Sequence, residues 1–345
     1  MTMKKRFPLF YKIYFISIAV FLVALAGFLF WLNGWLTSYN ASLPETVSAT
    51  FYNDVFVGKD TDRIIELSKT LTSEFETKDA LAEFIASNLT DLSYTSVSTG
   101  DEDVAKYVVK SGEYKIADYT LKRKDEKWTP DRVTLYLPDG DEYKVKLLST
   151  DTLYINGKAV SKDYITSTEE HISKKYLPEW VTAPEWITYT VSGLLKKPDI
   201  KVIDRNGNEP KLTDINGILT AEVVYDTLDE KITQRVLDGA MQYAIYMQND
   251  TTFSALHPYF EKDTELYKKI REALTMFSLT HQGYEFEDVS VSEYFRYDDE
   301  TVSMRVSFVH ILKKNYSEDY RNPMDITYFA RLVNGEYMIY EAYNN

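Results

Sequence analysis

The side chains best suited to acid–base chemistry lie in the C-terminal third of the chain. Strand alternation would place His310 on one face with apolar residues, either as a core histidine bonded to a neighbour or as a titratable group facing a cavity. On the last predicted strand Glu341 alternates with aromatic residues, where a carboxylate is expected only at an edge, in a pair or lining a pocket. The candidate cavity-lining residues are therefore His310, Glu341, Tyr294 and Tyr340.

The other histidines have ordinary interpretations. His171 lies in a polar stretch and is expected to be exposed, and His257 precedes a proline in a predicted turn. His281 is expected to end a helix, where a cation suits the helix dipole. None of these three predicts a catalytic site.

No recognised catalytic motif is present. The chain lacks Gly-x-Ser-x-Gly, Ser-x-x-Lys, His-Glu-x-x-His and a phosphate-binding Gly-x-x-x-x-Gly-Lys loop. Asp204-x-Asn206-x-Asn208 begins like a calcium loop, but Glu209 and Ile215 replace its glycine and final glutamate, so a hairpin turn at Asn206-Gly207 fits better. We expect no catalytic residues, no cofactor and no metal, and hence no enzymatic activity.

Charge and cysteine content restrict the partners and the compartment. Four of the 39 basic residues and none of the 53 acidic ones fall within the first 12 residues, which leaves a net charge of −18 for the rest. Such a body repels phosphate backbones, so nucleic acid is excluded as a partner, although a local basic patch is compatible with this charge. The absence of cysteine excludes thiol chemistry and disulfides, and it fits the exterior of a Gram-positive bacterium.

An apolar segment near the N-terminus predicts a membrane anchor. Ile13–Leu32 has 20 uncharged residues, enough to span about 30 Å of hydrocarbon as a helix. Trp31, Trp35 and Tyr39 would lie at the outer interface. We therefore predict a transmembrane helix over 13–35 that binds the lipid bilayer, a cytoplasmic tail over 1–12, and extracellular domains at the cell membrane.

A cleaved signal peptide is the alternative to an anchor. Ala24-Leu25-Ala26 resembles a cleavage site, but the apolar run continues for six residues beyond it, whereas a cleavage site should end that run. The anchor is the preferred interpretation.

Hydrophobic periodicity predicts a spacer and three regions outside the membrane. After a spacer over 36–44, helices around Phe51, Ile64 and Leu81 precede strands in a first domain over 45–148. A β-rich module over 149–228 follows, and then helices and four strands over 229–345. Expected helix starts are a capping box at Thr227–Glu230 and a cap at Asp263. Expected hairpins turn at Asp139-Gly140 and Asn334-Gly335.

Three helices followed by an antiparallel sheet occur twice in this scheme, and the order resembles the cone-shaped α+β fold of the nuclear transport factor 2-like superfamily. The resemblance covers about 230–345, and about 45–148 more loosely. The fold class is thus α+β, with two cone-like domains flanking a small β-rich module. The whole arrangement is similar to the extracellular part of the TcaA family of Gram-positive envelope proteins, although the cytoplasmic zinc ribbon of that family is missing from this short tail.

These expectations converge on a non-catalytic binding or scaffolding protein of the bacterial cell envelope, with a wall component or a membrane protein as its partner. The alternatives are an enzyme of the cone-fold superfamily that uses a Glu/His/Tyr acid–base site, and a structural spacer or secretion accessory.

Overall fold

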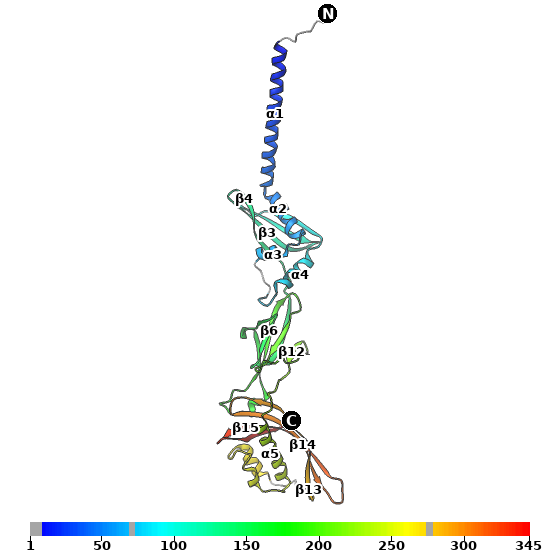
Figure 1. The fold of residues 1–345 in the computed structure, drawn as a ribbon, viewed down its shortest axis with the longest axis vertical. Helices are drawn as coiled ribbons and strands as arrows, with labels where there is room; N and C mark the ends of the chain where they lie inside the picture. The colour runs from blue at the N-terminus through cyan, green and yellow to red at the C-terminus, as the bar shows by residue number, and fades with distance from the viewer. Residues whose placement is uncertain (1–8, 69–72, 274–278) are drawn as a thin grey trace. The chain divides into compact units, whose positions relative to one another are not determined.

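The computed structural model describes residues 9–68, 73–273 and 279–345 (Figure 1). Its contacts divide the chain into two units. The first unit contains Met1–Glu142 and Ser192–Pro198. The second unit contains Tyr143–Val191 and Asp199–Asn345. The chain therefore passes between the units three times.

Helix α1 (Leu9–Ala41) contains the predicted anchor. Within the described residues it is the one helix long and apolar enough to cross a membrane, and no part of its apolar window is buried against the rest of the protein. The predicted spacer over 36–44 is wrong, because the helix continues to Ala41. The rings of Trp35 and Tyr39, one helical turn apart, stack with their centroids 5.7 Å apart and stabilise this last part of α1.

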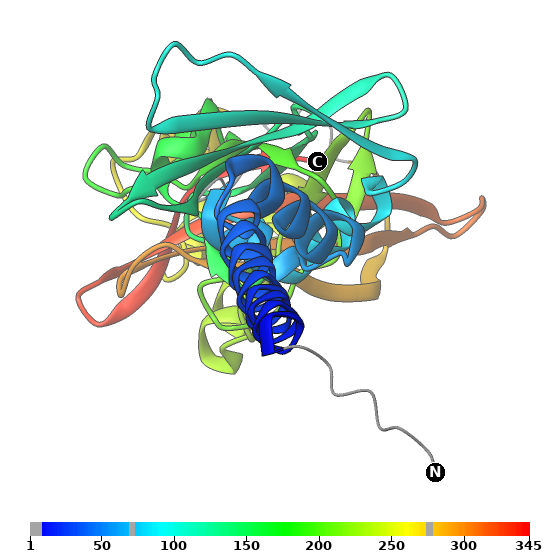
Figure 2. The same cartoon turned by 90° about the horizontal axis from the view of Figure 1, so that it is seen from above.

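The first unit places helices on one face of a four-stranded sheet, as expected from the sequence (Figures 1 and 2). Thr77 caps α4 by accepting a hydrogen bond from the Ala80 N–H. The helical elements are α2 (Pro44–Phe51), the π-helix η1 (Tyr52–Val57), α3 (Thr61–Ser68) and α4 (Lys78–Asn88). The strands, in sheet order, are β1 (Leu92–Val97), β2 (Val104–Ser111), β3 (Tyr114–Lys124) and β4 (Lys127–Leu135).

The predicted hairpin at Asp139-Gly140 is wrong. Strand β4 is an edge of the first sheet, whereas β5 (Asp141–Leu148) pairs within another sheet. Gly140 instead has φ +74° and lies so close to Gly193 that a Cβ there would come within 2.6 Å of the Gly193 carbonyl carbon. The glycine is thus required by a close backbone approach where the chain leaves the first unit.

The middle region is built of two small sheets. The five-stranded sheet has the order β11-β12-β5-β9-β8, and a three-stranded sheet has the order β10-β6-β7. Asn206-Gly207 is not the expected hairpin, since β10 pairs with β6 and β11 with β12. The remaining bounds are β6 (Thr152–Ile155), β7 (Lys158–Ala159), η2 (Lys162–Tyr164), β8 (Ile165–Glu170), η3 (Ile172–Lys175), β9 (Glu185–Leu194), β10 (Ile200–Ile203), β11 (Leu212–Ile215) and β12 (Ile218–Ala221).

The C-terminal domain packs helices against a second four-stranded antiparallel meander, β13 to β16 (Figure 1). Asn334 and Gly335 have φ values of +52° and +87°, which confirms the predicted hairpin turn. The elements are α5 (Glu230–Met247), η4 (Phe253–Leu256), α6 (Glu265–Glu272), β13 (Gly283–Arg296), β14 (Thr301–Lys313), β15 (Tyr320–Val333) and β16 (Glu336–Asn344).

Both predicted caps of this domain are displaced. Asp229 rather than Thr227 caps α5 by accepting from the N–H groups of Lys231 and Ile232. Thr264, not Asp263, caps α6, because Asp263 adopts a left-handed φ of +67°. Leu274 and Phe277 follow Ile270 at helical spacing, so the sequence predicts that this helix extends to them, but both lie outside the described residues.

One carboxylate joins the middle sheets to the C-terminal domain. Asp226 accepts a hydrogen bond from the Asn206 amide at 2.8 Å, one from the Arg296 N–H at 2.7 Å, and the ion pair of Arg205. The Arg205 guanidinium also lies 3.9 Å above the Phe295 ring. The loop after β10 is therefore fixed to the start of the C-terminal domain.

Replacement of Asp226 by alanine should weaken this junction. It removes the carboxylate that pairs with Arg205 and accepts from the Arg296 N–H, while Arg205 keeps its bond to the Arg296 carbonyl, so we expect a loss of about 2–3 kcal/mol, or about 5–10 °C in the melting of the second unit. Glu222→Ala is the matched control, because Glu222 pairs with Lys211 on the surface at 3.5 Å, and its cost should stay below about 1 kcal/mol. Equal melting shifts for the two variants would contradict the role of Asp226.

Candidate functional site

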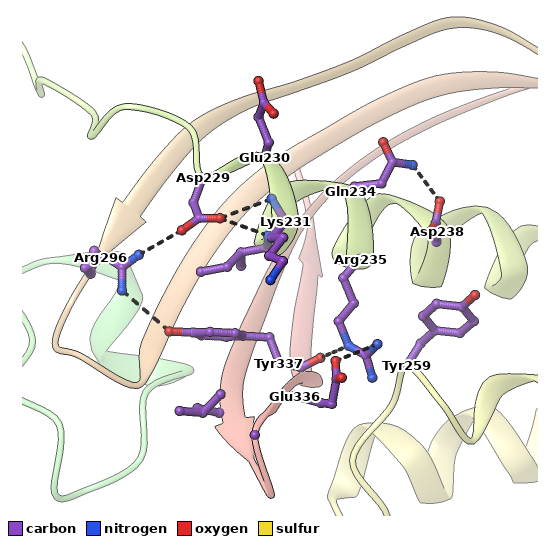
Figure 3. A pocket seen from close by; sticks show the side chains of 13 residues that line it. Asp229, Glu230, Lys231, Gln234, Arg235, Asp238, Tyr259, Arg296, Glu336 and Tyr337 are labelled. Atoms are coloured by element: carbon purple, nitrogen blue, oxygen red, sulfur yellow. Dashed lines mark hydrogen bonds and ion pairs between the residues drawn. The ribbon is translucent and has the colours of Figure 1, made fainter.

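A groove on the C-terminal domain lies between the start of α5 and the β15–β16 turn (Figure 3). It encloses about 880 Å³ and is open to solvent. Its lining is mostly polar and contains both signs of charge. The lining residues are Asp229, Glu230, Lys231, Ile232, Gln234, Arg235, Asp238, Tyr259, Arg296, Leu332, Gly335, Glu336 and Tyr337.

Arg235 fixes one wall of the groove. Its Nε donates to the Tyr337 carbonyl at 2.7 Å, and Nη2 donates to the Pro258 carbonyl at 2.6 Å. Nη1 pairs with Glu336 at 2.9 Å. Since these bonds use all three nitrogens, Arg235 is a structural cation that ties α5 to β16.

Arg296 lies at the other end of the groove and is held less completely. Nη2 donates to the Tyr294 hydroxyl at 2.8 Å. Nη2 also lies 3.7 Å from the Asp229 carboxylate, and Nη1 lies 3.5 Å from the Tyr337 hydroxyl (Figure 3). Burial raises the pKa of Tyr294, so this phenol stays neutral beside the guanidinium. A polar ligand would therefore meet a cation whose contacts to Asp229 and Tyr337 are long.

The groove can bind through hydrogen bonds and charge but does not display an acid–base pair. Three of its four carboxylates are engaged, since Asp229 caps α5, Asp238 accepts from Gln234 and Glu336 pairs with Arg235, whereas Glu230 is exposed at the first position of α5. It contains no histidine. Among the described residues, no group of three or more His, Cys, Asp or Glu side chains is placed to hold a metal ion.

A second cavity, of about 170 Å³, lies between the helices and the sheet. Its lining is apolar apart from the ends of Tyr243, Tyr328, Tyr343 and Asn344. The Tyr328 hydroxyl is buried without a hydrogen-bond partner, and burial raises its pKa. A cavity between helices and sheet is the feature that the sequence-based prediction of a cone-shaped domain implies.

His310 occupies the face predicted from strand alternation. It is fully buried and stacks on Phe286 with ring centroids 4.8 Å apart, and neither ring nitrogen has a hydrogen-bond partner. Burial lowers the pKa of His310, so the ring is neutral near pH 7. The expected bonded neighbour is thus missing, and the histidine behaves as an aromatic core residue.

Glu341 lies on the face opposite to the core because β16 contains a bulge. The register passes from Phe329↔Glu341 to Ala330↔Ile339, which leaves Tyr340 as the extra residue and reverses the alternation after it. Glu341 accepts from the Ala342 N–H at 3.0 Å. The Tyr340 hydroxyl is buried without a partner, and burial raises its pKa.

The four candidate cavity-lining residues do not converge. Phe286 is opposite His310 in the register, whereas Phe295, next to Tyr294, is opposite Ser303. Those two positions on β14 are about 20 Å apart along a strand. None of the four candidates lines the groove or the inner cavity.

The remaining histidines have structural contacts. His171 is half-buried rather than exposed and caps η3, accepting from the Ser173 N–H. His257 lies in the expected turn. His281 donates from Nδ1 to the Leu279 carbonyl and from Nε2 to Asp250 at 2.8 Å, and these bonds raise its pKa.

Sequence reasoning missed the groove, because its cations come from separate elements. Arg235 lies on α5 and Arg296 at the end of β13. The one part of the groove that the sequence indicated is the start of α5. The capping-box pattern at Thr227–Glu230 placed that helix start within two residues of the observed cap, Asp229. Their convergence depends on tertiary packing.

The C-terminal domain consists of helices followed by a four-stranded antiparallel meander with bulges, which is the element order predicted from the sequence. No protein-family model matches the chain. No curated protein matches it either.

One solved structure, of an Ntf2-like protein involved in plasmid conjugation, is similar to 83% of this chain and 86% of its own length, at 9% sequence identity and a TM-score of 0.23. A TM-score this low does not carry the role of that protein over to this chain.

His310→Phe should remove a pH dependence of stability. Because burial lowers the folded pKa of His310, the unfolded chain binds more protons, and stability must fall as pH drops below the unfolded pKa of about 6.5. His281 has the opposite sign, since its raised pKa stabilises the fold until pH rises through that pKa. The comparison of wild type with His310→Phe isolates the first effect.

Urea unfolding between pH 7.5 and pH 5 measures the difference between the two proteins. We expect the difference to grow in favour of the variant by up to about 1.4 kcal/mol per pH unit as pH falls. Parallel stability curves would show that His310 takes up its proton without cost, contrary to its burial.

Proposed function

We propose that this chain is a membrane-anchored, extracytoplasmic binding or scaffolding protein of the bacterial cell envelope, and that it does not catalyse a reaction. The single observation that carries the proposal is α1. This helix is apolar and free of contacts over its membrane-crossing window, and only Ser42 and Leu43 separate it from α2. A soluble protein would cover such a surface.

The side of the membrane follows from charge. Lys4, Lys5, Arg6 and Lys12 precede the apolar segment Ile13–Leu32, and the positive-inside rule retains such residues in the cytoplasm. The residues after α1 would then lie outside. The absence of cysteine suits a Gram-positive exterior, as does the similarity of the architecture to the TcaA family.

A binding role is supported by the groove on the C-terminal domain. Its volume suits an extended polar segment rather than a buried small substrate, and its charges already have internal partners apart from Glu230, Lys231 and the long contacts of Arg296. The candidate His/Glu/Tyr residues lie apart, which favours binding over catalysis.

The cysteine-free sequence allows a clean test of topology. Ser317→Cys places a single thiol on an exposed loop of the C-terminal domain, and Thr2→Cys places one in the basic tail. We expect a membrane-impermeant maleimide to label Cys at 317 on intact cells and Cys at 2 only after permeabilisation. The reverse pattern, or release of the protein by alkaline washing, would refute the proposed location.

Ligand contact at the groove can be tested by photo-crosslinking in cells. A crosslinking side chain at Lys231, in the groove, should give a discrete adduct that Arg296→Glu removes. The same side chain at the exposed Lys262, outside the groove lining, should give none. Identical adducts from both positions would mean that the groove is not the binding surface.

A further inference from the structure

The first-unit sheet carries a cluster of cations on the face away from its helices. Buried Ala117, Tyr119 and Leu121 show that the odd-numbered residues of β3 face the core, so Lys122 and Lys124 face outward. The register adds Lys127, opposite Lys124, and Arg132, opposite Thr120. We call Lys122, Lys124, Lys127 and Arg132 the basic face.

All four residues of the basic face are exposed, and none forms an ion pair with a described residue. The nearest outward carboxylate on β3, Asp118, is already occupied. It accepts from the Tyr136 hydroxyl at 2.6 Å and pairs with Lys115 at 3.0 Å and Lys106 at 3.1 Å. Burial opposes its ionisation, but these three donors hold the pKa of Asp118 below its usual value.

The stability of the sheet does not explain why the four cations of the basic face lie together. Lys124 and Lys127 are directly opposite each other in the ladder, and like charges in that position destabilise a sheet. Two turns nearby hold carboxylates, at Asp125-Glu126 and at 101–103, yet the cations form no pairs with them. A cluster of unpaired cations on a body of net charge −18 points to an anionic partner.

The end of the sheet that bears three of these cations is also the end that α1 enters. In an antiparallel meander the β1–β2 and β3–β4 turns lie at the same end, and the Arg123 N–H donates to the Asp103 carbonyl between them. Pro44 and Glu45, the first residues after the anchor link, line a groove together with Ser96–Tyr107 of the β1–β2 turn. The β3–β4 turn is therefore close to where the chain leaves the bilayer.

We propose that the basic face binds anionic lipid headgroups of the membrane that holds α1. The inference rests on the insertion of α1 but not on the side of the membrane on which the body lies. Lysines are compact charges that suit headgroup phosphates, and the short link between α1 and α2 keeps them at high local concentration near the lipid. A lipid surface is favoured over a soluble polyanion because the anchor already supplies it.

The test uses the full-length chain reconstituted through α1. Thr129→Cys puts the only thiol of the protein beside Lys122 on the exposed hairpin, where it carries an environment-sensitive dye. Vesicles contain phosphatidylcholine alone or phosphatidylcholine with phosphatidylglycerol. We expect blue-shifted emission, quenched by headgroup-labelled lipid, with phosphatidylglycerol only, and its loss at high salt.

Two controls make the result specific. The dye at Glu113→Cys, in the β2–β3 turn at the opposite end of the sheet, should show no shift. Replacement of the four basic-face residues by glutamine should raise the phosphatidylglycerol fraction needed for half the shift by at least about five-fold, since each cation near a charged surface contributes about that factor. The matched variant, with glutamine at the exposed Lys162, Lys262, Lys269 and Arg271, changes net charge equally and should not alter the shift.

Resistance of the reconstituted protein to alkaline extraction reports insertion of α1 separately, so failure of the anchor and failure of the basic face are distinguishable. With the anchor inserted, equal emission in neutral and anionic vesicles would overturn the proposal. So would an equal effect of the two quadruple variants. A full shift caused by soluble polyphosphate in neutral vesicles would assign the face to a soluble polyanion instead.

Discussion

The exclusion of charge from hydrocarbon is the constraint on which the rest of this structure depends. A bilayer accepts a helix whose backbone is paired internally and whose side chains are uncharged, and α1 meets both conditions over Ile13–Leu32. Because the helix continues to Ala41 and α2 begins at Pro44, only Ser42 and Leu43 link α1 to the helices that pack on the first sheet. With α1 inserted as proposed, the surface of this sheet and its helices lies next to lipid and must tolerate or use it.

Within the second unit, rigidity comes from a few contacts between the middle sheets and the C-terminal domain. Tyr176 stacks on Tyr343 and Phe329 with ring centroids 4.7 and 5.5 Å apart, and Asp226 fixes the loop after β10. Burial, reinforced by the Glu293 carboxylate, raises the pKa of Tyr225 to about 12 and keeps this phenol neutral as a donor. These contacts hold the middle sheets against the C-terminal domain that carries the groove.

The sequence predicts local features well and tertiary ones poorly. The anchor, the helices around Phe51 and Leu81, and the turn at Asn334-Gly335 depend on composition, periodicity or φ preference, all of which are encoded nearby. The bulge at Tyr340 moved Glu341 to the other face, because one inserted residue inverts all later alternation. The pairing of β5 and the groove cations require contacts between distant segments, which no short pattern records.

The distribution of charge over the surface of the protein, rather than its net charge, explains how an acidic protein can bind an acidic membrane. At physiological ionic strength a charge is screened beyond about 8 Å, so headgroups respond to the nearest side chains and not to the net charge of the chain. In the first unit Asp118 is neutralised internally by Lys106 and Lys115, which leaves the cations of β3 and β4 as the outward field of that face. An orientation that turned acidic side chains toward the lipid would be repelled at short range, which favours the orientation with the hairpin toward the lipid.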